Sequence, residues 1–183
     1  METTEPTDEA LMSRVKQGDL DALAPIFERH QAPLLNFFHR LSGDRETSRD
    51  LVQVTFERLI RYRSSYREEG CFRAWMYRAA RNAFYDHHRR SSRMRVVEPD
   101  EETGDAADVA DHGWREERRA RDLDEALGQL DESDRDLIVL SRFHGLQYDE
   151  IAAIMDKSIG AVKTRAHRAL HTLRRVYFQE ETT

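Results

Sequence analysis

Apolar residues recur every three or four positions along most of this chain, which is the spacing of one face of an α-helix. The clearest example lies in residues 145–175. On its second half, at about 100° per residue, one side of the predicted helix is apolar: Val162, Ala166, Ala169, Leu170 and Leu173. The other side carries cations and small polar groups: Lys163, Thr164, His167, Arg168, His171 and Arg174. No strand-like alternation occurs, so the pattern predicts an all-α protein.

A short turn divides this stretch into two helices. Tyr148 to Met155 predicts the first, and Asp156 falls where the chain usually needs a left-handed residue, a conformation that Asp tolerates better than most side chains. The Ser158 hydroxyl can cap the next helix. The segment therefore predicts a helix-turn-helix whose second helix can enter a DNA major groove. The alternative is an ordinary αα-hairpin with a solvated basic face.

A second helix, predicted over residues 71–90, has a different polar face. Trp75, Arg78, Asn82, Tyr85 and Arg89 share one side. The opposite side is apolar: Phe72, Met76, Ala80, Ala83 and Phe84. Aromatic rings stack on unpaired bases and arginines neutralise phosphates, so this face suits single-stranded nucleic acid. Alternatively, Trp75 and Tyr85 are core residues of a helical bundle.

Just upstream, arginines and tyrosines alternate, a pattern that favours a loop gripping single-stranded nucleic acid. The residues are Arg58, Arg61, Tyr62, Arg63, Tyr66 and Arg67.

Charge is divided unevenly along the 183 residues. The net charge is −6. However, residues 58–95 carry 11 basic and 3 acidic side chains, a net charge of +8, and residues 157–183 carry 6 and 2, a net charge of +4. Residues 96–113 carry 7 acidic side chains and no basic one, a net charge of −7. The two basic patches, and not the total, set the local field that nucleic acid would meet.

The acidic stretch also marks the domain boundary. Residues 96–113, VVEPDEETGDAADVADHG, lack aromatic residues and contain both Pro and Gly, so a disordered linker is predicted there. The chain is expected to comprise a helical unit over 1–95, the acidic linker 96–113, and a second helical unit over 114–183.

Several function classes are disfavoured. No apolar run of about 18 residues is present, so no membrane insertion is expected, and the acidic start METTEPTDEA is no signal peptide. The single cysteine, Cys71, excludes an internal disulfide and a multi-cysteine zinc site, and it is expected to be a core residue at a helix start. No nucleophile–base pair or glycine-rich phosphate loop occurs. The sequence thus predicts a cytoplasmic protein that is not an enzyme, with no catalytic residue, metal or cofactor.

Three segments together resemble one family. DLVQVTFERL (50–59), FRAWMYRAARNAFYDHHRR (72–90) and ALGQLDESDRDLIVLSRFHGLQYDEIAAIMDKSIGAVKTRAHRALHTLRR (126–175) are similar to conserved regions 2 and 4 of extracytoplasmic-function (ECF) sigma factors. The resemblance implies a subunit of bacterial core RNA polymerase that recognises promoter DNA and opens it. Region 2 is then expected to bind the β′ clamp helices and the melted −10 element. Region 4 is expected to sit on the β flap and to read the −35 element. A cognate anti-sigma factor is a further expected partner.

The resemblance also implies roles for individual residues. Polymerase docking is expected of Asp50, Gln53 and Phe56. Recognition of the −10 element is expected of Arg61, Tyr62, Phe72, Trp75, Arg78, Asn82 and Arg89, with residues 62–72 as the base-capturing loop. Recognition of the −35 element is expected of Ser158, Lys163, Thr164, His167 and Arg168. The chain departs from the family pattern at Arg49 and Val54, where glutamates are frequent, and at Asp156 in place of the turn glycine.

Two alternative functions, and one question about the linker, stay open at this point. The chain could be a stand-alone helix-turn-helix regulator, or a sigma-like decoy that sequesters an anti-sigma protein. Under the sigma-factor interpretation, the acidic linker either follows the RNA-exit path of the polymerase as an RNA mimic or is a passive tether.

Overall fold

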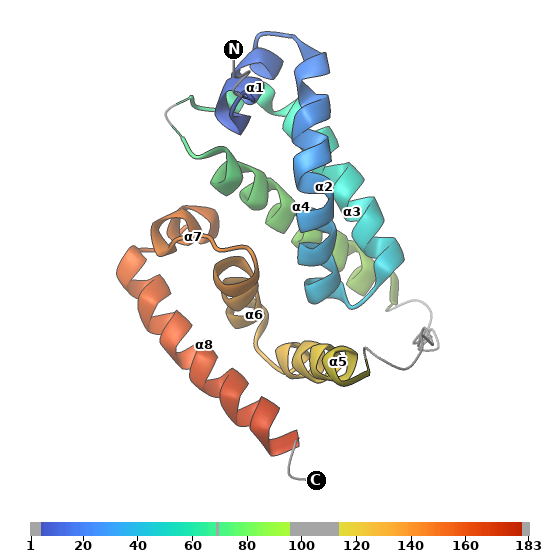
Figure 1. Cartoon of the computed structure of the whole chain (residues 1–183), viewed down its shortest axis with the longest axis vertical. Helices are drawn as coiled ribbons and strands as arrows, with labels where there is room; N and C mark the ends of the chain where they lie inside the picture. Colours follow the sequence, from blue (N-terminus) through green and yellow to red (C-terminus); the bar gives the residue numbers. More distant parts are fainter. Residues whose placement is uncertain (1–4, 69, 96–113, 181–183) are drawn as a thin grey trace.

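The computed structural model describes residues 5–68, 70–95 and 114–180, and all regular structure within these ranges is helical (Figure 1). The helices form two units, one on each side of the acidic segment. The prediction of an all-α fold with two small helical domains is confirmed. The predicted linker, residues 96–113, lies outside the described residues, so the choice between RNA mimic and passive tether stays open.

The first unit is built from four α-helices: α1 (Asp8–Lys16), α2 (Leu23–Ser42), α3 (Arg45–Arg61) and α4 (Phe72–Arg95). Two short 3-10 turns, η1 (Leu20–Ala22) and η2 (Arg63–Ser65), follow α1 and α3.

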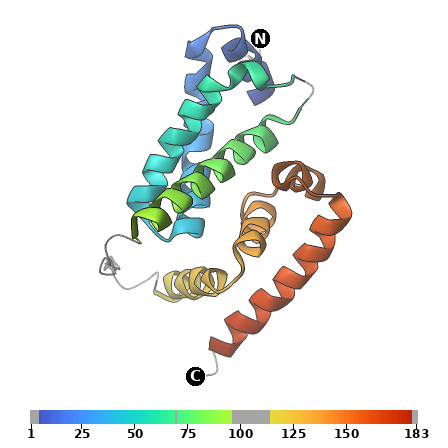
Figure 2. The same cartoon turned by 180° about the vertical axis from the view of Figure 1, so that it is seen from behind.

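Local sequence explains the tight hairpin between α2 and α3. Gly43 ends α2 with a left-handed backbone, φ 71°, which glycine adopts without a steric penalty. Asp44 then caps α3, because its Oδ2 accepts a hydrogen bond from Thr47 N at 2.6 Å. The two long helices consequently pack side by side, and α4 crosses them (Figures 1 and 2). Their shared core holds several aromatic rings: Phe37, Phe38, Tyr66, Phe72 and Tyr77.

The second unit comprises α5 (Trp114–Gly128), α6 (Glu132–Ile138), α7 (Tyr148–Met155) and α8 (Ile159–Glu180), with a π-helical turn, η3 (Val139–Phe143), directly after α6. The predicted helix-turn-helix is present. Asp156 is left-handed, φ 55° and ψ 50°, and Ser158 Oγ accepts a hydrogen bond from Ala161 N at 3.2 Å. Both predictions about this turn are confirmed.

The two units touch through α2 and through one side of α4 (Figures 1 and 2). Asp136 of α6 is 1% exposed and accepts hydrogen bonds from Arg81 Nε at 2.6 Å and from the Tyr85 hydroxyl at 2.7 Å. Nearer the start of α4, the Tyr77 hydroxyl lies 2.8 Å from His144 Nδ1. The sequence predicted the two units but not this contact between them.

Candidate nucleic-acid interface

The outward side of α4 combines cations, an amide and an aromatic ring. Arg78, Asn82 and Arg89 are exposed, and Trp75 is half-buried. The opposite side is in the core, with Phe72, Met76, Ala80, Ala83 and Phe84 all buried. The apolar face therefore orients the helix so that the predicted nucleic-acid face points outward.

Three adjoining grooves run along this face. The first, about 650 Å³, follows the loop and the start of α4, and its lining includes Ser65, Arg67, Trp75 and Arg78. A small groove of about 170 Å³ joins Trp75 and Arg78 to Asn82. The third, also about 650 Å³, is lined by Arg58, Tyr62, Arg81, Asn82, Tyr85, Asp86 and Arg89. Aromatic rings and arginines thus line a continuous path that fits a strand of unpaired nucleotides.

One carboxylate interrupts the positive charge of this path. Asp86 Oδ2 accepts a hydrogen bond from Arg58 Nη2 at 2.8 Å, and Asp86 also pairs with Arg89. The hydrogen bond from Arg58, with that from Arg89, outweighs partial burial and lowers the pKa of Asp86. Asp86 is therefore ionised near neutral pH, and its two arginine partners leave this cluster with a net positive charge.

The loop before α4 is only partly exposed. Arg61 and Tyr62 lie on the surface, and Tyr62 is 54% exposed. Tyr66 and Phe72 are 1% and 0% exposed. Burial, followed by the charge of Glu9, raises the pKa of Tyr66 to about 12. The expectation that Phe72 contacts DNA is corrected, because its ring is enclosed in the core and supports the loop from beneath.

Trp75 is both a packing residue and part of the nucleic-acid face, the two interpretations that the sequence left open. Its ring packs on Tyr66, with centroids 5.2 Å apart, and it also lines the first groove. Tyr85 behaves differently, because its hydroxyl is bonded to Asp136 of the second unit. Burial, and then the charge of Asp136, raises the pKa of Tyr85, so its hydroxyl stays protonated as a donor.

The second candidate surface is the outward side of α8. Lys163, Thr164, His167 and Arg168 are all exposed, whereas Val162, Ala166 and Ala169 are buried. Arg165 points elsewhere, because it pairs with Asp131, at 2.7 Å, and with Asp134 at the start of α6. Ser158, which is exposed, has its hydroxyl engaged in capping α8. The arrangement leaves two cations and two small polar side chains for a DNA groove.

The residues expected to dock on polymerase lie on α3. Asp50 and Gln53 are exposed, and Gln53 Nε2 donates to Glu57 Oε1 at 3.0 Å. Phe56 is only 5% exposed, because Phe27 of α2 covers it with ring centroids 4.8 Å apart. Direct docking through the Phe56 ring is therefore corrected, and the exposed ring at this position is Phe27.

Sequence reasoning missed Phe27, because helical spacing does not distinguish it from the core residues of α2. The buried side of α2 carries Ile26, His30, Leu34 and Phe37, at helical spacing. On a helical wheel Phe27 falls between Leu34 and Phe38, both of them buried, yet Phe27 itself is 40% exposed. A large aromatic ring that packing leaves exposed is a candidate for binding a partner.

The predicted burial of Cys71 is not observed. Cys71 is exposed, and its Sγ donates to Glu150 Oε1 at 2.9 Å, so the expectation of a core cysteine is wrong. Cys71 directly precedes α4, and its side chain contacts Glu150 of α7 instead of the core. Among the described residues, no group of His, Cys, Asp and Glu is arranged to hold a metal ion. None of the described helices has the length and apolar character needed to cross a membrane.

Comparison with known proteins shows that the segments carrying the two surfaces match models of one protein family. Residues 26–94 match the family model for Sigma-70 region 2, and residues 120–173 match that for Sigma-70, region 4. The chain is 33% identical over 163 residues to RNA polymerase sigma factor CarQ of Myxococcus xanthus, covering 89% of this chain and 93% of the relative. It is 32% identical over 179 residues to ECF RNA polymerase sigma factor SigE of Mycolicibacterium smegmatis, covering 93% and 69%.

Two solved structures are also similar. The sigma factor RpoE in complex with the anti-sigma factor NepR from Bartonella quintana aligns with a TM-score of 0.72 and 26% identity, covering 86% of this chain and 96% of that one. CnrH in complex with the cytosolic domain of CnrY aligns with a TM-score of 0.70 and 25% identity, covering 92% and 96%.

Proposed function

The chain belongs to the ECF sigma factors of the sigma-70 family, and from this we propose that it binds bacterial core RNA polymerase, recognises promoters and opens the DNA for initiation. The first unit, within residues 1–95, is the region 2 domain, and the second, within residues 114–183, is the region 4 domain. The chain acts through binding and has no catalytic residue or cofactor. It works in the cytoplasm, where its polymerase is.

One observation carries the proposal. The same chain presents a groove of aromatic, amide and arginine side chains on α4 and an exposed polar side on α8. The first suits unpaired bases, since each base stacked on an aromatic ring contributes about 1–3 kcal/mol. The second suits base edges and phosphates in a duplex groove. A protein that both reads duplex DNA and holds a melted strand has the two contacts that promoter opening requires.

The proposed role of each residue follows from whether its side chain is exposed. On α8, Lys163, Thr164, His167 and Arg168 read the −35 element, and Ser158 keeps the start of that helix in place. On α4 and its loop, the −10 strand lies along Trp75, Arg78, Asn82 and Arg89, with Arg61 and Tyr62 at the entrance. Polymerase docking uses Asp50 and Gln53 on the β′ clamp helices, with Phe27 as the apolar contact above Phe56. The β flap receives the second unit.

An anti-sigma factor is a further proposed partner. The solved relatives RpoE and CnrH are each in complex with a second protein, and for RpoE that protein is an anti-sigma factor. The likeness to RpoE over 86% of this chain supports a partner of the same class here.

Two substitutions test the division of labour. Arg168→Ala is expected to weaken −35-dependent run-off transcription with core polymerase, because a base or phosphate contact is lost. Asn82→Ala is expected to leave duplex binding intact and to impair opening, measured by permanganate reactivity of the −10 thymines. Arg14→Ala is the control, since among the described residues the Arg14 side chain pairs with Asp19 and lines neither surface. Equal loss of both steps in both variants contradicts the proposal.

Binding assays without polymerase, together with the run-off assay, separate the alternatives. A stand-alone regulator would bind duplex promoter DNA tightly without polymerase, and a decoy would bind an anti-sigma protein but yield no run-off product. A promoter selected from a randomised library by the wild-type holoenzyme provides the template.

A further inference from the structure

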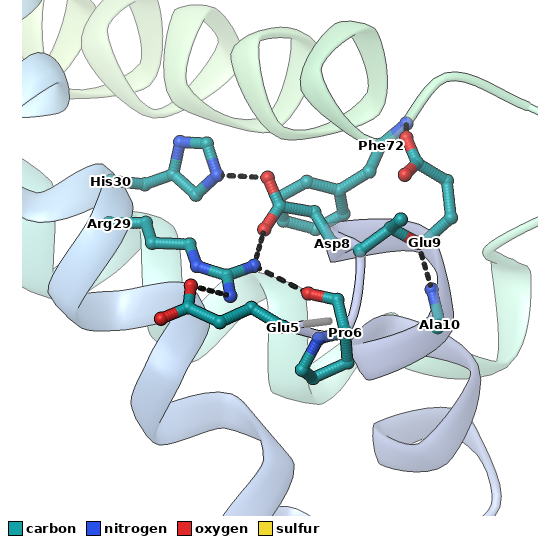
Figure 3. Close-up of polar contacts among 9 residues, drawn as sticks. Glu5, Pro6, Asp8, Glu9, Ala10, Arg29, His30 and Phe72 are labelled. Carbon is teal, nitrogen blue, oxygen red and sulfur yellow. Dashed lines mark hydrogen bonds and ion pairs between the residues drawn. The ribbon is translucent and has the colours of Figure 1, made fainter. Parts of the chain in front are cut away.

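Helix α1 contributes to neither candidate DNA surface, yet it holds both ends of the loop segment 66–72. Glu9 Oε1 accepts a hydrogen bond from Phe72 N at 3.2 Å, at the first residue of α4 (Figure 3). Lys16 Nζ donates to Tyr66 O at 2.9 Å. Glu9 and Lys16 are seven positions apart, so two helical turns bring them to the same side of α1. One helix therefore ties the beginning and the end of this loop segment.

Helix α1 is itself firmly attached to α2. Asp8 Oδ2 lies 2.6 Å from His30 Nε2, and Asp8 Oδ1 accepts from Arg29 Nη1 at 2.9 Å (Figure 3). Partial burial alone would raise the pKa of Asp8, but hydrogen bonds from His30 and Arg29 outweigh it, and the pKa lies below its usual value. The carboxylate thus stays charged near neutral pH. On the inner side, α1 is anchored by buried Leu11, Met12 and Val15.

The loop ends held by α1 lie directly beneath the aromatic ring of the groove. Tyr66 and Phe72 are buried, with ring centroids 5.2 Å and 6.3 Å from that of Trp75. His30 also contacts Phe72, at 5.5 Å between ring centroids. A displacement of Tyr66 or Phe72 would therefore move Trp75 and change the shape of the first groove.

We propose that Glu9 and Lys16 are positioning residues for base capture. Glu9 fixes the start of α4, Lys16 fixes the loop at Tyr66, and together they hold the groove open before a base arrives. This inference rests on the proposed function, since it takes the groove as the site that captures the −10 strand. A groove that is ordered in advance binds more tightly, because the ordering does not have to occur during capture.

The first test measures promoter opening by the holoenzyme of this chain with bacterial core polymerase. The probe is a library-selected promoter with 2-aminopurine in the −10 element. Lys16→Met and Glu9→Ala are each expected to slow opening by about tenfold, since each removes a hydrogen bond involving a charged group. Binding of the unmelted promoter is expected to be unchanged. This separation of the opening rate from duplex binding would not follow from a general loss of folded protein.

Conservative variants provide rescue. Glu9→Gln keeps a side-chain oxygen that accepts from Phe72 N, and Lys16→Arg keeps a cation that donates to Tyr66 O, so both are expected to open at nearly the wild-type rate. Arg14→Met is the matched control on the same helix, because within the described ranges the Arg14 side chain bonds with Asp19 and not with the loop.

A second measurement keeps the test decisive if a variant is poorly stable. Amide hydrogen exchange of the isolated full chain should accelerate at Phe72 in Glu9→Ala and return to the wild-type rate in Glu9→Gln, with amides of α8 unchanged. Unaltered exchange at Phe72 and wild-type opening in both Glu9→Ala and Lys16→Met would overturn the inference. If Asn82→Ala opens at the wild-type rate as well, the proposed function itself fails, and the two failures are thereby distinguished.

Discussion

Asp156 joins α7 to α8 with left-handed backbone angles, φ 55° and ψ 50°, and it is the non-glycine residue with positive φ among those described. That conformation costs about 1–2 kcal/mol for an ordinary L-residue and less for Asp. Asp156→Gly should therefore raise the free energy of unfolding by about 0.5 kcal/mol, since the greater entropy of Gly in the unfolded chain offsets part of the gain. Asp156→Val should lower it by about 1–2 kcal/mol. Urea denaturation measures both.

Asp149→Gly is the control for this prediction. Asp149 lies in the first turn of α7, where the backbone is helical, so glycine there should destabilise the protein by about 1 kcal/mol. A stabilising Asp149→Gly, or a destabilising Asp156→Gly, would show that backbone strain does not govern the turn.

At the residue scale, the sequence predicted exposure better than it predicted contact. Lys163, Arg168 and Asn82 are on the surface, as helical spacing required. Phe72 and Phe56 were given roles by position in a motif, yet both are buried. Periodicity marks the side of a helix that is apolar, but it does not show which neighbouring ring, such as Phe27, covers a residue at the edge of that side.

At the element scale, α7 and α8 could be predicted because their signals are local. The left-handed residue and the cap at Ser158 lie at the helix ends, and the apolar stripe repeats every three or four residues within α8 itself. The role of α1 could not be predicted, because Glu9 and Lys16 act on residues more than 45 positions away. Such pairings depend on how helices pack, which a helical wheel does not contain.

Arg165 shows how packing divides the basic side chains of α8. It bonds with Asp131 and Asp134 and so joins α8 to the start of α6, whereas Arg168, one turn further on, is exposed. Arg165→Ala should lower the free energy of unfolding by about 1 kcal/mol, a modest value because the pair is partly exposed. Arg168→Ala should change it by less than about 0.5 kcal/mol, as surface substitutions usually do.

Thermal denaturation followed by circular dichroism measures the two variants, and promoter binding by the holoenzyme should show the reverse order of effects. Loss of stability in Arg168→Ala with none in Arg165→Ala would contradict this assignment of structural and DNA-binding arginines.

For the whole molecule, the contact between the units has an α2 part and an α4 part, and the α4 part is a stripe with four-residue spacing: Arg73, Tyr77, Arg81 and Tyr85. This stripe lies beside the outward face that carries Asn82. From the sequence alone, a polar stripe that contacts another unit cannot be distinguished from one that faces solvent. Its partners, Asp136 and His144, are more than 50 residues away, so only the folded arrangement shows that the stripe is an intramolecular interface.

His144 makes this interface sensitive to pH. Burial, followed by the nearby charges of Arg73 and Arg40, lowers the pKa of His144 from 6.5 to about 4. The closed arrangement thus favours neutral histidine. Its contribution to closure is present above the ordinary pKa of 6.5 and is lost as the pH falls from there towards about 4. Asp136 acts in the opposite direction, because burial raises its pKa and protonation reduces the cost of enclosing it.

We expect the units to separate in part as the isolated chain is acidified from about pH 7 to about pH 5, across the titration of an exposed histidine. Small-angle X-ray scattering would record this as a rising radius of gyration, while circular dichroism shows that the helices persist. His144→Gln keeps an acceptor for the Tyr77 hydroxyl but gains no proton, so its expansion should be clearly smaller. Because Asp136, Arg73 and Arg40 are unchanged in that variant, the difference between the two curves isolates His144. Identical curves would mean that His144 does not control closure.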